Sequence, residues 1–298
     1  MSRRKVSDRG YSGRPGAGGR PGPKGRGSRP HERPPGRPGR AGAGTKDGRY
    51  WIYGHHAALA AIRNPRRQTT RLLTTAKTQA QFAADIEAAR ARLGDRLAIV
   101  TAEEISAQVG NEAVHQGLAV EVLPLPIPAI DRVLADAGPQ AMLLVLDQVT
   151  DPHNVGAILR SAAAFGVTAV VTTHHHSPPE SGSLAKAASG GLEQVPLLRV
   201  ANLAQALQSM KKAGFWCLGL AAEASQPLAG ASLTGRIAFV LGAEGAGLRR
   251  LTRAHCDVLV RLPSGPGLIQ LNVSNAAAVA LYERSRTNSG NLGEPDKG

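Results

Sequence analysis

FVLGAEGAGLRR, residues 239–250, and LPSGPGLIQLNVSNAAAVALYE, residues 262–283, decide the fold of the last third of this 298-residue chain. Each segment begins with an apolar run typical of a buried strand, continues into a glycine-rich turn and ends in a pattern typical of a helix. Glycine lets the backbone approach a bound molecule closely because no side chain intervenes. The two segments therefore predict a small-molecule pocket at the ends of two strands.

The second segment places four polar side chains directly before or at the start of an alanine-rich helix, namely Gln270, Asn272, Ser274 and Asn275. A helix start attracts hydrogen-bonding groups because its first N–H groups have no partner inside the helix. Capping alone needs fewer polar side chains than this. We therefore expect part of the group to contact a ligand or substrate.

Apolar runs alternate with helical patterns from residue 140 to residue 286. This alternation predicts an α/β fold with a mostly parallel sheet covered by helices on both faces. Ligands on such sheets bind beyond the carboxyl ends of the strands. The loops at residues 147–154, 242–247 and 264–270 fall there, so we expect them to converge on one site.

The rest of the chain divides by composition. Residues 50–124 repeat the alternation on a smaller scale and predict a compact α/β domain. Three prolines in PLPIPAI disfavour both helix and central strand, so residues 125–139 are expected to form an extended linker. Residues 287–298 are expected to form a flexible tail.

Most of the positive charge lies at the N-terminus. The formal net charge of the chain is +14, and residues 1–49 hold 14 Lys or Arg against three acidic residues, a net charge of +11. The same segment contains 13 Gly and 7 Pro and almost nothing apolar to bury, which predicts disorder. Such a segment is either a solubilising extension or an electrostatic tether to the phosphate backbone of RNA, and we favour the tether.

Several functional classes are disfavoured. GAEGAG, residues 242–247, lacks the GxGxxG spacing of dinucleotide-binding turns, and no GxxxxGK loop for nucleotide phosphates occurs. The chain has no apolar run of about 18 residues for a membrane span, and no apolar stretch follows the basic N-terminus as a secretion signal requires. The sequence thus predicts neither a membrane protein nor a secreted one.

The two cysteines and the histidine tract do not predict a metal site. Cys217 and Cys256 lie in apolar segments without metal-ligand spacing, which is typical of buried thiols in a reducing cytosol. Residues 174–176 are three consecutive histidines whose side chains point in different directions, so a polar loop is the favoured interpretation. We expect a cytoplasmic protein without a bound metal.

DPHNVGAILRSAAAFG, residues 151–166, together with FVLGAEGAGLR and LIQLNVSNAAAVALYE resembles the three ordered motifs of the SpoU branch of the SPOUT methyltransferases. IYGHHAALAAIRNPRR, residues 52–67, and AVHQGLAVEV, residues 113–122, are similar to the RNA-binding domain of bacterial large-subunit rRNA guanosine 2′-O-methyltransferases. The resemblance covers residues 50–286. It implies a C-terminal domain over residues 140–286 that forms a trefoil knot, an exception to the rule against threaded chains, and binds S-adenosylmethionine in a homodimer. It also implies an L30e-like, RNA-binding fold for residues 50–124.

The resemblance also implies site residues by motif position. The cofactor would be held largely by backbone, at Gly242, Leu262 and Leu271. The catalytic centre would contain Asn154, Arg160, Glu244 and Asn272, with Gln270, Ser274 and Asn275 near the substrate. The family usually has Ser where this chain has Gln270, which puts the role of that hydroxyl in doubt.

Methyl transfer from a sulfonium to a hydroxyl needs positioning more than covalent help. Asn154 stands at a predicted helix start, where it can cap the helix and also serve the site. Arg160 stays protonated at neutral pH, so we expect it to stabilise a developing alkoxide rather than to act as a base. We expect Glu244 to orient Asn272 or Arg160.

The front domain offers candidate RNA contacts, which are Arg63, Arg66, Arg67, His115 and Gln116. Each of them is equally consistent with an ordinary surface loop residue, because sequence alone does not show that they share one basic face.

The sequence therefore predicts an S-adenosylmethionine-dependent RNA ribose 2′-O-methyltransferase that modifies a guanosine of large-subunit ribosomal RNA. Two alternatives stay open at this point. One is a transfer-RNA ribose methyltransferase of the same branch, and the other is a non-catalytic RNA-binding factor for ribosome assembly in which Gln270 signals lost chemistry.

Overall fold

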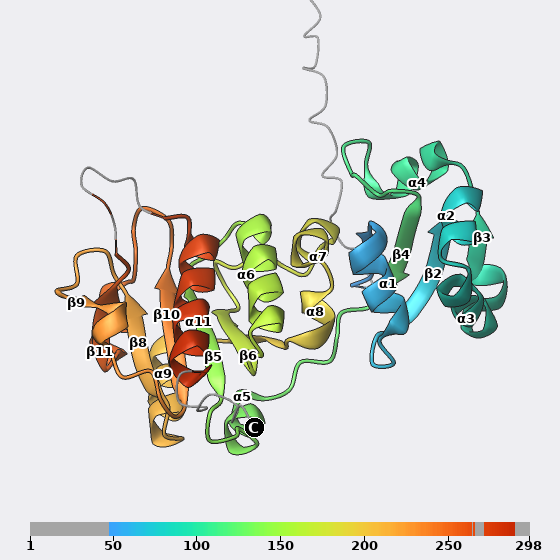
Figure 1. Ribbon diagram of the computed structural model, residues 1–298. Coiled ribbons are helices and arrows are strands. Elements are labelled where there is room, and N and C mark those ends of the chain that lie inside the picture. The colour runs from blue at the N-terminus through green and yellow to red at the C-terminus, as the bar shows by residue number, and fades with distance from the viewer. Residues whose placement is uncertain (1–47, 264, 266–270, 290–298) are drawn as a thin grey trace, which may run out of the picture. The chain divides into compact units, whose positions relative to one another are not determined.

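Figure 1 shows a computed structural model of the chain, which describes residues 48–263, 265 and 271–289. The expected disordered tail lies outside the described residues except for its last two positions, and Gln270 lies outside them as well. None of the helices in the described part has the length and apolar character needed to cross a membrane.

The front part of the described chain is a four-stranded sheet in the order β1-β4-β2-β3. Strand β4 runs antiparallel to both of its neighbours, and β3 runs parallel to β2. The elements are β1 (Tyr50–Tyr53), α1 (His55–Arg63), β2 (Thr69–Thr74), α2 (Ala76–Gln81), α3 (Ala83–Leu93), η1 (Gly94–Arg96), β3 (Leu97–Ile99), α4 (Ala102–Val109) and β4 (Leu118–Val122).

Helices cover both faces of this small sheet because side chains alternate along each strand. In β2, the buried Leu72 belongs to the same apolar cluster as Ile86 of α3. Its neighbour Leu73 packs instead with Ile105 of α4. One strand therefore contributes to two apolar layers. The L30e likeness of this part stays a prediction.

A short helix, α5 (Ile130–Ala135), lies inside the stretch expected to be an extended linker. The expectation was wrong for these residues because the prolines stop at Pro128 and the apolar residues then follow helical spacing. Leu134 is buried in the cluster that also contains Leu207 and Met210. A helix of this length is not stable by itself, so packing against the second sheet must stabilise it.

The second part is a seven-stranded sheet in the order β7-β6-β5-β10-β8-β11-β9, and every pair of neighbours is parallel. Its strands are β5 (Met142–Asp147), β6 (Ala169–Thr173), β7 (Leu197–Val200), β8 (Trp216–Leu220), β9 (Gln226–Pro227), β10 (Ile237–Gly242) and β11 (Val258–Arg261). The α/β class with a mostly parallel sheet is confirmed. The trefoil knot stays a prediction.

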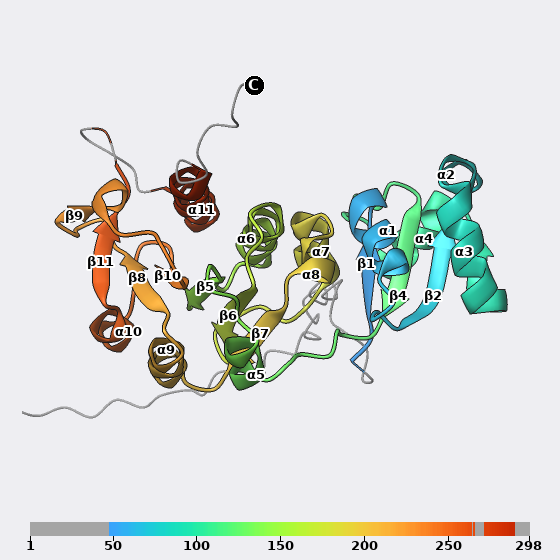
Figure 2. The same cartoon turned by 60° about the horizontal axis from the view of Figure 1, so that its bottom comes forward.

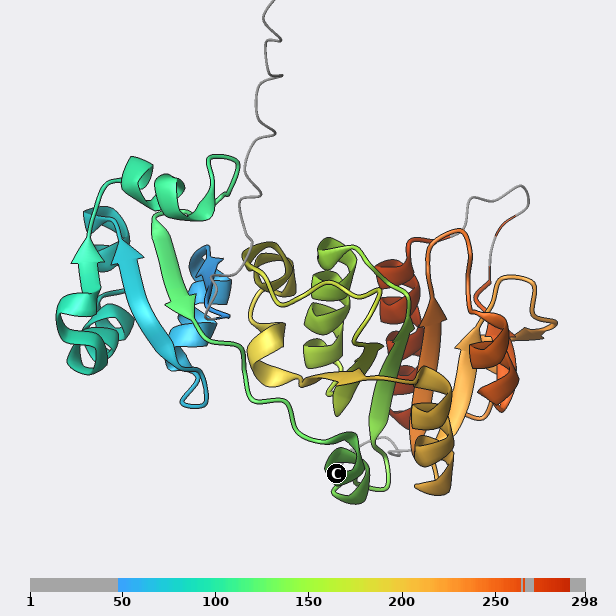
Figure 3. The same ribbon diagram turned by 180° about the vertical axis from the view of Figure 1, so that it is seen from behind.

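Helices cover both faces of the large sheet (Figure 2). Helices α6 (Pro152–Ala164), α7 (Gly182–Ala188) and α11 (Val273–Ser289) lie on one face. Helices α5, α9 (Leu203–Lys212) and α10 (Arg250–His255) lie on the other, and Figure 3 shows α5 and α9 from that side. Because α11 continues to Ser289, the expected flexible tail begins at least three residues too early.

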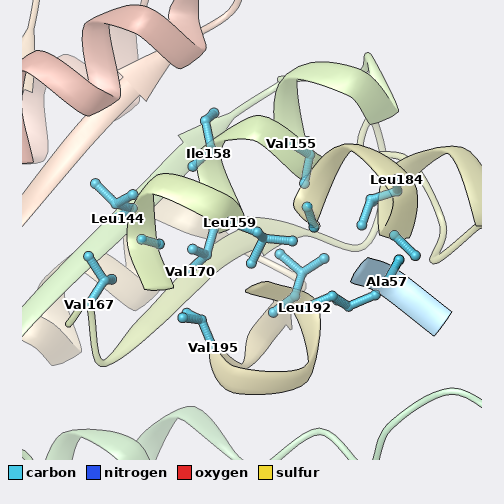
Figure 4. Packing of buried hydrophobic residues seen from close by; sticks show 14 of the residues in the cluster. Ala57, Leu144, Val155, Ile158, Leu159, Val167, Val170, Leu184, Leu192 and Val195 are labelled. Atoms are coloured by element: carbon cyan, nitrogen blue, oxygen red, sulfur yellow. The ribbon is translucent and has the colours of Figure 1, made fainter. Parts of the chain in front are cut away.

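Helix α6 is the centre of its layer (Figure 4). Its apolar side chains fill the space between the sheet and the two short helices α7 and α8 (Gly191–Gln194). The labelled residues of this cluster are Ala57, Leu144, Val155, Ile158, Leu159, Val167, Val170, Leu184, Leu192 and Val195. Gly156 lets α6 approach α7, since a Cβ built on it would lie 2.5 Å from both the Leu184 carbonyl oxygen and the Ala187 Cβ.

Arg67 is buried and joins β1 and the loop before β2 to the region around α8. Its Nη2 donates to Glu193 Oε1 at 2.6 Å, and its Nε lies 3.0 Å from the same oxygen. The Tyr50 hydroxyl donates to Glu180 Oε2 at 2.7 Å, and burial together with that carboxylate raises the pKa of Tyr50 well above its ordinary value. Tyr50 therefore stays a donor, and the cluster is held by charge-assisted hydrogen bonds.

We expect Gly156→Ala to lower the free energy of unfolding by about 1–3 kcal/mol, because the added methyl group forces α6 away from α7. The helix propensity of alanine works in the opposite direction by up to about 1 kcal/mol. Gly138→Ala is the matched control, since nothing lies within 4 Å of a Cβ built there. Urea unfolding followed by circular dichroism measures both, and a Gly156→Ala protein as stable as the wild type would contradict the packing argument.

We expect Arg67→Ala to lower the free energy of unfolding by about 3–5 kcal/mol, because the substitution leaves the Glu193 carboxylate buried without its cation. Arg63→Ala is the control, since its ion pair with Asp85 is exposed and is worth less than about 1 kcal/mol. The same urea titration compares the two variants. If Arg67→Ala and Arg63→Ala lowered the free energy of unfolding equally, the buried ion pair would contribute no more to stability than the exposed one.

Candidate active site

The candidate site lies where β5 and β10 end side by side. Asp147 and Gly242 are partners in the last register position of this strand pair. The chain then leaves β5 toward α6 and leaves β10 through the glycine turn, so residues from both connections meet at one edge of the sheet. This is the carboxyl edge, where ligands bind on parallel sheets.

Asn154, Glu244 and Asn272 form a closed hydrogen-bonded cluster at this edge. Asn154 Nδ2 donates to Glu244 Oε1 at 2.9 Å, and Asn272 Nδ2 donates to the same oxygen at 2.7 Å. Asn272 Nδ2 also donates to Asn154 Oδ1 at 2.9 Å. Three residues that lie 28 to 118 positions apart in sequence are thus brought together by folding.

The cluster leaves two groups available to a ligand. Within the described residues, the second Glu244 oxygen has no hydrogen-bond partner, and one N–H of Asn154 is also unused. The contact between Glu244 and Asn272 agrees with the expected orienting role, although that role stays a prediction. An acceptor and a donor side by side can hold a hydroxyl group.

Asn154 does not cap its helix, contrary to one of the two roles expected for it. The cap of α6 is Asp151, whose Oδ1 accepts from the His153 backbone N–H at 2.9 Å, and Pro152 occupies the first helical position. Asn154 therefore lies in the first turn, only 8% exposed, with its side chain free to join Glu244.

The start of α11 is organised by Asn272. Its Oδ1 accepts from the Ser274 backbone N–H at 2.8 Å and from the Ser274 hydroxyl at 2.6 Å. Asn275 is exposed and makes no hydrogen bond to another described residue. Ser274 is thus tied to the cluster through Asn272, and Asn275 is not.

A cavity of about 600 Å³ adjoins the cluster. Gly242, Leu262 and Leu271 all line it, together with Glu244. That the first three hold a cofactor stays a prediction. A Cβ on Gly242 would lie 2.1 Å from the Gly247 carbonyl carbon, so this turn closes only around a glycine. The volume falls in the range of small-molecule pockets, which is roughly 300–1,000 Å³.

The structure does not bring Arg160 into the cluster. Its side chain is exposed on α6, and it forms no hydrogen bond or ion pair with another described residue. It lies six residues after Asn154, about 9 Å further along the helix axis. An approach to the reacting atoms would therefore depend on the substrate or on a second chain.

The front-domain candidates lie in different environments. Arg67 is 3% exposed and paired with Glu193, so a direct RNA contact for Arg67 does not fit this structure. Arg63 is exposed but makes a two-point ion pair with Asp85. Arg66 Nη2 donates to the Glu193 carbonyl at 3.2 Å and keeps an exposed side chain.

His115 and Gln116 shape a turn. His115 Nδ1 accepts from the Gly117 backbone N–H at 3.1 Å, and its other ring nitrogen lies 3.1 Å from the Ser106 hydroxyl. Burial lowers the pKa of His115, which favours the neutral ring. Gln116 has a positive φ of 56°, and its side-chain oxygen accepts from Lys186 at 2.8 Å. Both residues are already engaged by the protein.

Sequence reasoning missed the pair formed by Asp147 and Arg249. Asp147 is fully buried and accepts from Arg249 Nε at 2.6 Å and from the Arg249 backbone N–H at 3.0 Å. A lone acid at the end of an otherwise apolar strand was the available signal, since buried charges are nearly always paired.

Among the described residues, no three His, Cys, Asp or Glu side chains gather as metal ligands. Burial, followed by the Asp257 carboxylate, raises the pKa of both Cys217 and Cys256 to about 12. The two thiols are therefore structural and unreactive at neutral pH.

The chain matches two family models and many relatives. Residues 141–282 match the SpoU rRNA Methylase family, and residues 51–128 match the family of RNA 2'-O ribose methyltransferase substrate binding. The 23S rRNA (guanosine-2'-O-)-methyltransferase RlmB of Xylella fastidiosa is 40% identical over 239 residues, which are 79% of this chain and 96% of that protein. RlmB of Vibrio cholerae is 39% identical over 255 residues, with 80% of this chain and 98% of that protein covered.

Solved structures agree in fold. The SpoU methyltransferase AviRb from Streptomyces viridochromogenes, in complex with the cofactor AdoMet, has a TM-score of 0.68 and 22% identity, with 82% of this chain and 92% of that chain covered. The AdoMet-bound rRNA methyltransferase from Sinorhizobium meliloti has a TM-score of 0.68 and 20% identity, with 81% and 88% covered. The resemblance seen in the three sequence motifs is therefore confirmed, and the chain belongs to the SpoU rRNA methylase family.

Proposed function

We propose that this chain transfers a methyl group from S-adenosylmethionine to a ribose 2′-hydroxyl of a guanosine in large-subunit ribosomal RNA. The observation that carries the proposal is the Asn154–Glu244–Asn272 cluster at the mouth of a cavity lined by a glycine turn. The relatives that share about 40% identity over nearly their full length are 23S rRNA (guanosine-2'-O-)-methyltransferases, which supports the same substrate.

The cavity fits a nucleoside cofactor. Its lining is mostly backbone and apolar side chains from the ends of β8, β10 and β11, and Glu223, Glu244 and Arg253 are its ionisable members among the described residues. Gly242, Leu262 and Leu271 would hold the cofactor by backbone groups and apolar contact. When bound, the cofactor supplies an electrophilic methyl group on a sulfonium.

The protein's own contribution is positioning. The free Glu244 oxygen would accept the hydrogen of the ribose hydroxyl, and the free N–H of Asn154 would fix the same oxygen from the other side. Asn272 keeps both side chains in place through its two donated hydrogen bonds. The Arg160 guanidinium would stabilise the alkoxide that develops while the hydroxyl proton passes to the free Glu244 oxygen.

The proposal includes a homodimer in the cytoplasm. Helix α11 exposes the large apolar side chains Val279 and Tyr282, which are 40% and 59% exposed. Arg160 is exposed on α6, which packs directly against α11. A second copy seated on these two helices would cover the apolar side chains and bring Arg160 near a reacting centre.

Transfer of a labelled methyl group tests the activity. We expect the full chain to methylate a 23S rRNA transcript with S-adenosylmethionine, and mass spectrometry of the digested product to place the methyl group on a guanosine ribose. Transfer RNA is the comparison substrate. Methylation of transfer RNA instead of the 23S transcript would overturn the substrate, and failure of calorimetry to detect cofactor uptake would overturn the enzyme class.

We expect Arg160→Ala to lower kcat about 100-fold or more, because the cation at the developing alkoxide is lost. The affinity for S-adenosylmethionine should change less than twofold, since Arg160 does not line the cofactor cavity. Arg132→Ala is the control, because Arg132 is an exposed arginine on α5. An Arg160→Ala enzyme with near-normal turnover would remove Arg160 from the mechanism.

A further inference from the structure

A second cavity, of about 530 Å³, opens at the same edge of the large sheet and is separate in its lining from the cofactor cavity. It lies between the ends of β6 and β7 and the starts of α9 and α10. Its lining residues are Thr173, His175, His176, Ala201, Asn202, Leu203, Ala204, Arg249, Arg250, Leu251 and Thr252. The proposed methyl transfer uses none of them.

The lining combines cations with apolar side chains. Arg249 and Arg250 line the cavity together with His175 and His176, and no described residue that lines it carries a carboxylate. Leu203 and Leu251 provide apolar wall, and Leu251 is 58% exposed despite its size. Cations beside apolar surface suit a phosphate that carries a flat, partly apolar base.

The side chain of Arg249 is held in position by a hydrogen-bonded ion pair. The fully buried Asp147 carboxylate holds its Nε at 2.6 Å and its backbone N–H at 3.0 Å. Neither terminal nitrogen of Arg249 has a hydrogen-bond partner among the described residues, and the side chain remains 47% exposed. A guanidinium fixed at one nitrogen presents its remaining donors in a preset direction, which suits a phosphate.

A short segment of chain connects the proposed catalytic cluster with this second cavity. Glu244 belongs to the hydrogen-bonded cluster, and Arg249 follows it by five residues. Five residues span at most about 18 Å even when fully extended. An RNA strand whose ribose lies at Glu244 is therefore within reach of the cavity with a neighbouring nucleotide.

We propose that this cavity binds the phosphate and base of an RNA nucleotide that flanks the methylated one. The inference rests on the proposed function, which it deepens by assigning a subsite for the substrate strand. Arg249 and Arg250 bind the phosphate, and the base lies against Leu251 and the loop of His175.

RNA binding by cavity variants tests the proposal. Fluorescence anisotropy with a labelled 23S fragment that the wild type methylates compares the full chain with Arg250→Ala. We expect the Kd to rise about fivefold or more and the slope of log Kd against log salt to fall by roughly 0.7, the value for one lost contact to a single strand. Cofactor affinity, measured by calorimetry, should stay within twofold of the wild type.

Two further variants sharpen the result. Arg249→Lys keeps the charge but loses the fork held by Asp147, so we expect its RNA Kd to rise as well. Arg132→Ala removes an exposed charge on α5, which does not line this cavity, and should leave the RNA Kd unchanged. Thermal unfolding confirms that each variant is folded.

The outcomes separate this inference from the proposed function. A wild-type protein that methylates the fragment, with Arg250→Ala and Arg249→Lys binding RNA within twofold of it, overturns the cavity assignment alone. Photo-crosslinks from 4-thiouridine in the flanking nucleotides should map to the peptide that contains Leu251, and crosslinks confined to other peptides would also overturn it. A wild type that methylates no fragment overturns the proposed function, and a wild type that binds no RNA overturns both.

Discussion

The parallel pairing of β5 with β10 is the constraint on which the rest of the functional edge depends. It sets Asp147 beside Gly242, and these two residues open the two connections from which the site is built. Because α6 begins a few residues after Asp147 and the glycine turn follows Gly242, the pairing brings Asn154 to Glu244. Asn272 then closes the cluster and caps α11 with the same side chain, so one amide couples the last helix to both loops.

Residues of the turn after β10 and of the chain that follows it line two different cavities at the sheet edge. Glu244 contributes a carboxylate to the cluster, where a hydroxyl must be held, while Arg249 contributes a cation to the second cavity. The buried Asp147 carboxylate accepts from the backbone N–H and from Nε of Arg249, and so fixes the position of that arginine. In the described residues Glu244 is hydrogen-bonded to Asn154 and Asn272, whereas Arg249 is paired with Asp147.

Most of the fold could be predicted from the sequence, since continuous apolar strands such as Leu143 to Leu146 allow few arrangements other than a covered parallel sheet. The meeting of the connections after β5 and β10 was predictable for the same reason, whereas the third expected loop, residues 264–270, lies outside the described residues except for Gly265. The cap of α6 was not, because Asp151 and Asn154 are both good capping residues and only the three-dimensional position of Glu244 separates them. Arg67 was misassigned because a basic residue in a polar loop is normally exposed. Arg67 is buried only because it pairs with Glu193, which lies 126 residues away in the sequence. The helix α5 was missed because its stability comes from tertiary packing.

Cys217 lies on β8 and Cys256 directly follows α10, and burial raises the pKa of each thiol to about 12, so both stay protonated at pH 7. Peroxides and other oxidants attack the thiolate, so sulfenic acid forms slowly at both positions. Oxidation of these two thiols is therefore not expected to disturb the strand and helix beside the turn after β10.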